Sequence, residues 1–306
     1  MTTLFILSGF LGSGKTSTLR HVIENLEDAK GTVAVVNEAG ELGLDGRLVQ
    51  RVGIPVHELT NGCVCCSLRV DFVALLEALF KSDPPSRILI EASGLAEPAM
   101  LAKTLSRFDP LIKWRKTVVI LDAEIWETRE VQGDFFLAQL QSADLVLVSK
   151  TDLYPADRVE AFVLEIGATI PETPLETVIH GRVDLKLFFE QPKKIKDPEL
   201  IPESQDLSAY QSFSYESAQS LDEDKWRRFI FERGHEFARI KGQLKLKGGK
   251  AYFDFVRGRS NWLPPLESVS GNRLVFVGQN LDPKNLKTRL DNLAYQPGPP
   301  APEGGD

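Results

Sequence analysis

Residues 9–16 carry the glycines, lysine and hydroxyl groups that a phosphate-binding loop uses. Their sequence, GFLGSGKT, matches the pattern G-x-x-x-x-G-K-[ST]. Glycines let the backbone curl so that N–H groups point at phosphate oxygens, and a helix start adds its dipole. Lys15 can reach the β- and γ-phosphates, and the Thr16 hydroxyl can complete the ligand shell of a Mg²⁺ ion. The predicted nucleotide contacts here are Gly9, Gly12, Ser13, Gly14, Lys15, Thr16 and Ser17.

The residues on either side supply the elements that this loop needs. Leu4–Leu7 is a short apolar run, typical of a buried strand. After the loop, apolar residues recur at i, i+3, i+4 and i+7, which marks one face of a helix: Leu19, Val22, Ile23 and Leu26. Strand, glycine-rich turn and helix start is the context in which the motif binds phosphate. A chance glycine turn before a helix is the disfavoured alternative.

The three cysteines of the chain form one cluster, Cys63, Cys65 and Cys66. This odd, clustered set argues against a disulfide framework and predicts reduced thiols. The cluster precedes an amphipathic helix, whose dipole favours thiolate, and thiolates suit a soft cation such as Zn²⁺. Glu38 and Glu41, in an acidic and glycine-rich loop, are candidates for a fourth ligand. Buried apolar cysteines, an exposed redox cluster and, for the acidic loop, a plain solvated turn are the alternatives.

A second acidic position lies near the end of the predicted strand Arg87–Ala92. Nucleotide hydrolases of this kind carry an acid, two residues and a glycine here, which corresponds to Glu91 and Gly94. The acid reaches Mg²⁺ through water, and the glycine N–H can sense the γ-phosphate. Lys15 and Thr16 are the catalytic candidates that stabilise charge, and Glu91 and Glu41 are the candidates for positioning the attacking water.

Residues 149–152, SKTD, resemble the guanine-reading N-K-x-D of GTPases. In that motif the aspartate accepts hydrogen bonds from guanine, and the lysine stem packs on the base. Asp152 therefore argues for GTP over ATP, with Lys150 against the ring. Ser149 departs from the usual Asn, and a polar strand exit is the alternative. His180 and Gly181 are expected to close over the base.

Strands that alternate with helical segments predict an α/β fold, a doubly wound and mainly parallel sheet with helices on both faces. The expected strands are Leu4–Leu7, Thr32–Asn37, Arg87–Ala92, Thr117–Asp122, Asp144–Ser149 and Leu175–Ile179. The predicted domains are a P-loop GTPase domain at 1–190, a linker rich in proline and charge at 191–206, a smaller C-terminal α+β domain at 207–295 and a disordered tail at 296–306.

The C-terminal domain is expected to combine a hairpin with two helices. Its predicted elements are a strand start at Phe213–Tyr215, a helix at Trp226–Phe237, a hairpin of Gln243–Lys247 and Ala251–Val256, a strand at Arg273–Val277 and a helix at Lys284–Leu293. Residues 239–259 are basic, which favours a solvated sheet edge that resists aggregation over a nucleic-acid contact.

Composition narrows the classes of protein. The 306 residues are 42% hydrophobic, and the net charge of −7 argues against nucleic acid as the main partner. No apolar run approaches the roughly 20 residues that span a bilayer, so no membrane partner is expected. A strand within four residues of the N-terminus leaves no room for a signal peptide, which predicts a cytoplasmic protein.

These motifs resemble the CobW-like family of metal-trafficking GTPases, which includes cobalamin-biosynthesis, nitrile-hydratase-activator and zinc-chaperone members. The matching segments are GFLGSGKT at 9–16, NEAGELGLDG at 37–46, NGCVCC at 61–66, EASGLAEP at 91–98, SKTD at 149–152, RIKG at 239–242 and RLVFVGQNL at 273–281. Ala39 departs from the family, which often has Phe there. No histidine-rich stretch is present, which favours metal delivery over storage.

The resemblance implies a slow GTPase that carries metal to a client metalloprotein. It implies GTP and Mg²⁺ at Gly9–Thr16, and Zn²⁺ at the cysteine cluster with Glu38 as a further ligand; Co²⁺, Ni²⁺ and Fe²⁺ remain open. A homodimer is also left open. The alternatives are a non-catalytic metal or redox sensor that binds nucleotide, and an ATP-dependent kinase or ligase.

Overall fold

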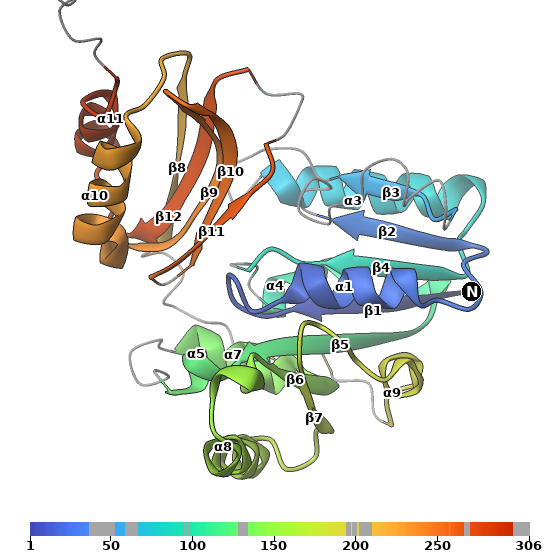
Figure 1. The fold of residues 1–306 in the computed structure, drawn as a ribbon. Helices are drawn as coiled ribbons and strands as arrows, with labels where there is room; N and C mark the ends of the chain where they lie inside the picture. Colours follow the sequence, from blue (N-terminus) through green and yellow to red (C-terminus); the bar gives the residue numbers. More distant parts are fainter. Residues whose placement is uncertain are drawn as a thin grey trace, which may run out of the picture. The chain divides into compact units, whose positions relative to one another are not determined.

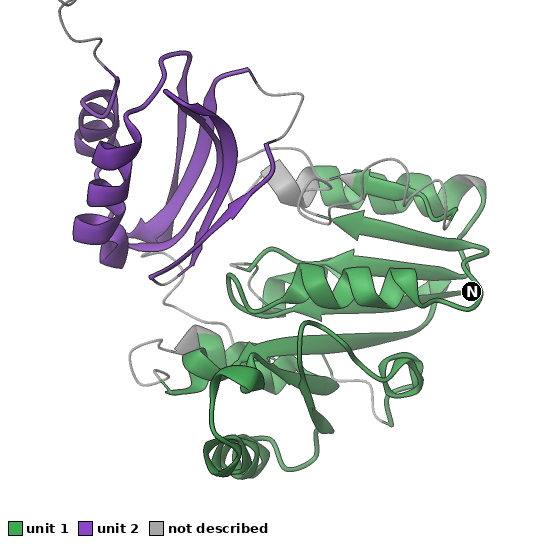
Figure 2. Ribbon diagram, in the orientation of Figure 1, with its two compact units in different colours: residues 1–207 green, residues 208–306 purple. Residues whose placement is uncertain are grey.

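The chain folds into two compact units, residues 1–207 and 208–306 (Figures 1 and 2). The computed structural model describes residues 1–36, 53–58, 67–94, 96, 98–127, 134–193, 197, 201, 210–256, 258–265 and 270–295. Within these ranges, every helix is too short or too polar to cross a membrane.

Unit 1 is built on a seven-stranded sheet in the order β3-β2-β4-β1-β5-β6-β7. Its strands are β1 (Thr2–Ser8), β2 (Thr32–Val36), β3 (Val56–Glu58), β4 (Arg87–Glu91), β5 (Ile112–Asp122), β6 (Leu145–Ser149) and β7 (Leu175–Val178). All neighbouring strands run parallel, so the chain must cross over between them, mostly through helices. The carboxyl ends of β1, β4, β5 and β6 therefore meet along one edge of the sheet.

Helices lie on both faces of this sheet (Figure 1). They are α1 (Lys15–Glu24), α3 (Ser67–Ser82), α4 (Pro98–Ser106), α5 (Ala123–Glu127), α7 (Asp134–Ser142), α8 (Ala156–Thr169) and α9 (Leu185–Phe189), with 3-10 turns η2 (Asp109–Leu111) and η3 (Thr151–Leu153). One buried cluster joins α1 and α9 to one face, and another joins α3 and α4 to the opposite face. The predicted doubly wound α/β fold is confirmed.

Strand β1, which leads into the phosphate loop, is packed from both sides. Phe5 faces the α1 side and Ile6 the α3 side, and both are at most 3% exposed. The Phe5 ring contacts Trp114 and Phe188, with ring centroids 5.1 and 5.5 Å away. Burial of one such aromatic side chain is worth about 1.5–3 kcal/mol. The start of the loop is therefore fixed to the core.

Unit 2 is a five-stranded antiparallel sheet in the order β11-β10-β9-β12-β8. Its elements are β8 (Tyr210–Ser217), α10 (Glu223–Arg233), η6 (Gly234–Glu236), β9 (Phe237–Leu246), β10 (Gly249–Val256), β11 (Arg259–Leu263), β12 (Asn272–Gln279) and α11 (Pro283–Asp291). Both helices share one core with the sheet, centred on the fully buried Trp226. A smaller α+β domain was predicted, and unit 2 confirms that fold class.

Several boundaries differ from the sequence-based expectations. The helix predicted to reach Phe237 ends at Arg233, because Phe237 already pairs with Gly278 in the sheet. Strand β5 begins at Ile112, earlier than predicted, since its first half contains lysine and arginine that hid the apolar pattern. Five described helices and strands were not predicted from the sequence: β3, α5, α8, α9 and β11. The predicted tail lies outside the described residues, as does most of the predicted linker.

Candidate functional site

The segment between β1 and α1 forms a tight loop that depends on glycine. Gly9, Gly12 and Gly14 have φ values of 134°, 73° and 102°, in the region that side chains disfavour. A Cβ atom on Gly9 would lie 2.2 Å from the carbonyl oxygen of Ile120 in β5. Gly14, at the start of α1, has no side chain to cap the first-turn N–H groups, so a bound anion can take that place.

Lys15 lies inside this curl and is only 6% exposed. Its Nζ donates hydrogen bonds to the carbonyl oxygens of Gly9 and Phe10, at 2.8 and 2.9 Å. The amine is thus held within the loop by acceptors that phosphate oxygens could replace. The predicted phosphate-binding lysine and the predicted glycines are brought together as one cradle.

Thr16 meets the acid that the sequence singled out at the end of β4. The Thr16 hydroxyl donates to Oε1 of Glu91 at 2.6 Å, across 75 positions of sequence. This contact follows from strand order, because β4 lies beside β1 and Glu91 pairs with Leu7. A hydroxyl and a carboxylate in contact form an all-oxygen donor set, which is the kind that Mg²⁺ prefers.

Gly94 presses directly on the phosphate loop. A Cβ atom there would lie 2.7 Å from the backbone nitrogen of Leu11 and 2.9 Å from its Cα. The backbone N–H of Ala92 also donates to Leu7 of β1, at 2.9 Å. The segment after β4 therefore has no room for a side chain at Gly94, and a displacement of the loop must move this segment as well.

The SKTD segment is tied to the phosphate loop by its first residue. The Ser149 hydroxyl, in a residue 5% exposed, donates to the carbonyl oxygen of Ser13 at 2.6 Å. Lys150 follows in a left-handed conformation, with φ of 60°. Asp152 is exposed in η3. The serine that departs from the usual Asn thus still links the two motifs, and Asp152 remains accessible to a ligand.

Asp122 is a site residue that sequence reasoning missed. It ends β5, pairs in register with Ser149 of β6, and is fully buried. Its Oδ2 lies 2.5 Å from Nζ of Lys150. The available signal in the sequence was an acid at the end of an apolar strand. Only the tertiary structure places it beside the SKTD segment and identifies Lys150 as its partner.

Tyr154 closes the turn that follows the SKTD segment. Burial, to which the carboxylates of Glu127 and Glu124 add, raises the pKa of Tyr154 to about 12, so the phenol is protonated at neutral pH. Its ring packs edge-on against Phe162 of α8, with centroids 5.1 Å apart. This contact attaches the turn to the helix behind it.

The segment after β7 contacts α1. A Cβ atom on Gly181 would lie 2.5 Å from the carbonyl carbon of Ser17 and 2.6 Å from the nitrogen of Thr18. His180 before it is left-handed, with φ of 52°. The expectation that this pair covers the base stays a prediction, but Gly181 does lie against α1, the helix that follows the phosphate loop.

The predicted metal ligands lie outside the described residues: Cys63, Cys65, Cys66, Glu38 and Glu41. The strands that precede them are described. Val36 of β2 pairs with Glu58 of β3, so both strands reach the same edge of the sheet. Among the residues that the structure does describe, no group of three or more His, Cys, Asp and Glu could hold a metal ion.

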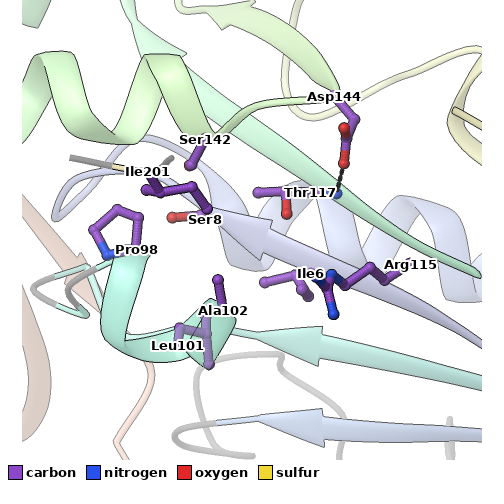
Figure 3. A pocket seen from close by; sticks show the side chains of 10 residues that line it. All are labelled: Ile6, Ser8, Pro98, Leu101, Ala102, Arg115, Thr117, Ser142, Asp144 and Ile201. Carbon is purple, nitrogen blue, oxygen red and sulfur yellow. Dashed lines mark hydrogen bonds between the residues drawn. The ribbon is translucent and has the colours of Figure 1, made fainter. Parts of the chain in front are cut away.

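A separate pocket lies on the α4 side of the sheet, between α4 and the end of α7 (Figure 3). Ser8 and Thr117 belong to its lining, and the Thr117 N–H donates to Oδ2 of Asp144 at 2.7 Å. Ile201, from the predicted linker, also lines the pocket. Because Ser8 directly precedes Gly9, this pocket adjoins the base of the phosphate loop without containing any of the predicted site residues.

Two family profiles match the two units. The profile described as CobW/HypB/UreG, nucleotide-binding domain, matches residues 3–174. The profile described as cobalamin synthesis protein cobW C-terminal domain matches residues 210–294.

Individual relatives agree with these profiles. Zinc chaperone YjiA of Escherichia coli (strain K12) is 34% identical over 194 residues, covering 60% of this chain and 59% of the relative. Zinc chaperone YeiR of the same organism is 33% identical over 155 residues, covering 50% and 47%. The chain thus spans about half the length of these two relatives. Zinc chaperone CobW of Pseudomonas aeruginosa is 28% identical over 356 residues, covering 93% and 89%.

Among solved structures, Zn(II)-bound YjiA GTPase from E. coli is similar with a TM-score of 0.48. The two sequences are 23% identical, and the match covers 96% of this chain and 99% of that chain.

Proposed function

The chain belongs to the CobW/HypB/UreG family and carries a CobW C-terminal domain, and from this premise we propose that it is a GTP-hydrolysing metallochaperone. It binds a transition metal, first of all Zn²⁺, and transfers it to a client metalloprotein under the control of the bound nucleotide. The observation that carries the proposal is the contact between Thr16 and Glu91, because it joins the phosphate loop to the end of β4.

The phosphates of GTP would bind in the curl between β1 and α1. Ser13 supports this assignment, because its buried hydroxyl has no hydrogen-bond partner among the described residues and a phosphate oxygen would supply one. Lys15 would exchange its carbonyl acceptors for β- and γ-phosphate oxygens. The proposed contacts are Gly9, Gly12, Ser13, Gly14, Lys15, Thr16, Ser17 and Gly94.

The oxygen donors of Thr16 and Glu91 fit a Mg²⁺ ion. Thr16 would bind it directly, and Glu91 would bind it through water. When bound, Mg²⁺ neutralises negative charge on the β- and γ-phosphates. The fit rests on donor chemistry and on the 2.6 Å contact between the two side chains.

In the proposed reaction, the oxygen of a water molecule attacks the γ-phosphorus and the bond to the β–γ bridging oxygen breaks. GDP and inorganic phosphate leave; the phosphate takes up the water's hydroxyl, and the remaining proton of the water passes to a phosphate oxygen or to solvent. Lys15 would stabilise the charge that moves onto the bridging oxygen. The Gly94 N–H would respond to the γ-phosphate, an assignment supported by the close approach of Gly94 to Leu11 of the phosphate loop. Glu91 and Glu41 are the candidates that position the water.

Guanine would be read by Asp152 and Lys150. The exposed Asp152 carboxylate can accept hydrogen bonds from the ring N–H and the exocyclic amine of guanine, whereas adenine would present a lone pair to it. The stem of Lys150 would pack on the base plane. This chemistry favours GTP over ATP, and thus a GTPase over an ATP-dependent kinase or ligase.

The metal cargo is assigned to Cys63, Cys65 and Cys66, with Glu38 as a further ligand. Thiolates prefer a soft ion, and three relatives are named zinc chaperones, so Zn²⁺ is the first choice and Co²⁺, Ni²⁺ and Fe²⁺ follow. An incomplete thiolate site beside a nucleotide switch suits a metal that is held and then released. The receiver would be a client metalloprotein.

The test is zinc affinity by chelator competition on reduced protein, with GDP and then with a slowly hydrolysed GTP analogue. We expect a shift of about tenfold or more, worth about 1.4 kcal/mol. The Cys65→Ala variant should lose tight binding, whereas Lys15→Ala should keep it but lose the response to nucleotide. By linkage, zinc must change the affinity for the GTP analogue by the same factor.

Zinc binding that is tight but indifferent to nucleotide would contradict the chaperone and favour the second candidate, a sensor. The sequence feature behind that candidate is the compact cysteine cluster itself. A sensor should also show negligible GTP hydrolysis with or without metal, so a turnover assay on the same samples separates the two functions.

A further inference from the structure

Asp122 is a buried carboxylate whose two oxygens have different partners. Its side chain is 1% exposed, and its Oδ2 lies 2.5 Å from Nζ of Lys150. Its Oδ1 accepts a hydrogen bond from the backbone N–H of Glu124, at 3.0 Å. Taking a carboxylate out of water costs several kcal/mol unless a cation and hydrogen bonds compensate it. The buried position therefore makes Asp122 depend on Lys150, and it also restrains where the lysine can lie.

Lys150 needs such a restraint. Its left-handed φ of 60° is a conformation that a residue with a side chain adopts at a cost of about 1–2 kcal/mol. The residue links the end of β6 to η3, which begins at Thr151 and contains Asp152. The backbone conformation of Lys150 therefore sets the direction in which the chain leaves β6, and with it the position of Asp152.

Asp122 also lies beside Ser149, the residue that connects the SKTD segment to the phosphate loop. It pairs in register with Ser149, whose hydroxyl donates to Ser13 and also lies 3.3 Å from the carbonyl oxygen of Leu121. The ends of β5 and β6 thus hold the SKTD segment by two side chains. Ser149 ties the segment to the phosphate loop, and Asp122 ties it to the core of the sheet.

We infer that Asp122 is a positioning residue for guanine recognition: by holding Lys150 in its left-handed conformation, it sets the place of Asp152 relative to the phosphate loop. It acts through Lys150 and need not touch the nucleotide. The inference rests on the proposed binding of guanine nucleotide by the SKTD segment. It adds a determinant of base selectivity that lies outside the motif.

The alternative is that Asp122 only stabilises the fold. The two roles differ in what they predict for the choice of base. If Asp122 is purely structural, replacing it would lower the stability of the protein, and any loss of affinity would be equal for GDP and ADP. A positioning acid affects the base-reading geometry, so the preference for GDP over ADP must shrink.

The test compares Asp122→Asn with a matched variant, Asp144→Asn. Both residues accept a backbone N–H bond beside β5, but Asp144 stands at the start of β6, at the opposite end from the SKTD segment. Asparagine keeps an acceptor oxygen in each case. Lys150 is 27% exposed, so its amine can turn to water when Asp122 is neutralised, and the variant is expected to fold. Circular dichroism checks folding, and titration with a fluorescent GDP, in competition with ADP, gives both dissociation constants.

We expect Asp122→Asn to weaken GDP binding by about tenfold, equivalent to about 1.4 kcal/mol, and to leave ADP binding nearly unchanged. Asp144→Asn should keep both constants. In Lys150→Met the acid has lost its partner, so adding Asp122→Asn to that variant should cause no further loss of GDP affinity. Asp122→Asn alone leaves the Lys150 ammonium without its carboxylate, whereas the double variant removes both charges. The test therefore stays valid if Asp122→Asn alone does not fold.

Two results would overturn the inference: an unchanged ratio of GDP to ADP affinity in folded Asp122→Asn, or additive losses in the double variant. A parent protein that binds both nucleotides equally well is a different failure. It would refute the proposed reading of guanine itself, before any variant is compared.

Discussion

The hydrogen bond from Ser149 to Ser13 is the contact whose removal tests the nucleotide site most directly. It joins the SKTD segment to the phosphate loop, across 136 positions of sequence, at 2.6 Å. Ser149→Ala removes only the hydroxyl, since the residue is 5% exposed and alanine fits in the same space. We expect this variant to weaken nucleotide binding as well as stability.

The size of the effect follows from burial. Ser13 is fully buried, so its carbonyl oxygen cannot exchange the lost hydroxyl for bulk water. A buried group left unsatisfied costs about 1–3 kcal/mol. If about 1–2 kcal/mol of this falls on the nucleotide-bound state, the dissociation constant for GDP rises about five- to thirtyfold. Ser149→Asn should recover part of the loss, because an amide N–H can donate to the same carbonyl.

Ser142→Ala is the matched control. Its hydroxyl also belongs to a buried serine, and it donates to a backbone carbonyl, that of Gln139, at 2.7 Å. Both variants should lower the free energy of unfolding in urea by similar amounts, but only Ser149→Ala should weaken GDP binding measured by calorimetry. Equal GDP affinity in the two variants would refute the idea that Ser149 positions the phosphate loop.

Three further changes have defined outcomes. Gly94→Ala should weaken GDP binding about tenfold or more in the same titration, because its Cβ would press on the phosphate loop, whereas Gly167→Ala, in open space within α8, should bind normally. Burial raises the pKa of Glu176, so the folded state favours the protonated acid and loses stability as the pH rises above the usual glutamate range. The thermal midpoint of Glu176→Gln should therefore exceed that of the parent by a margin that grows as the pH rises from about 4. Asp144→Ala should cost about 1–3 kcal/mol in urea unfolding, because it leaves the Thr117 N–H without this acceptor, and it should leave GDP affinity intact.

Local sequence predicted the parts of unit 1 that local physics determines. Buried parallel strands are continuous apolar runs, and for that reason β1, β2, β4 and β6 were located to within one or two residues. β3 is only three residues long and contains His57 and Glu58, so no apolar run marks it. It forms because β2 offers it an edge to pair with, which is information that a short window does not hold.

The candidate site likewise combines features that local sequence predicts with features that depend on strand order. The phosphate loop was predictable because each glycine is required by backbone conformation at its own position. The partnership of Asp122 with Lys150 was not, because it depends on strand order: β5 and β6 are neighbours, which puts the two side chains within 2.5 Å. The same argument applies to Thr16 and Glu91, whose pairing the motif suggested but only the adjacency of β1 and β4 produces.

Strand order also bears on how nucleotide could control metal. β2, which ends two residues before Glu38, pairs with β4 through Val35 and Ile90. β4 carries Glu91, which touches Thr16 of the phosphate loop. A change that the γ-phosphate makes at Glu91 therefore acts on the strand beside the one that leads to the proposed metal segment. Coupling by this route runs through β4 alone and needs no contribution from unit 2. A weakened contact between Thr16 and Glu91 should therefore make the affinity for metal independent of the bound nucleotide, even when each ligand still binds.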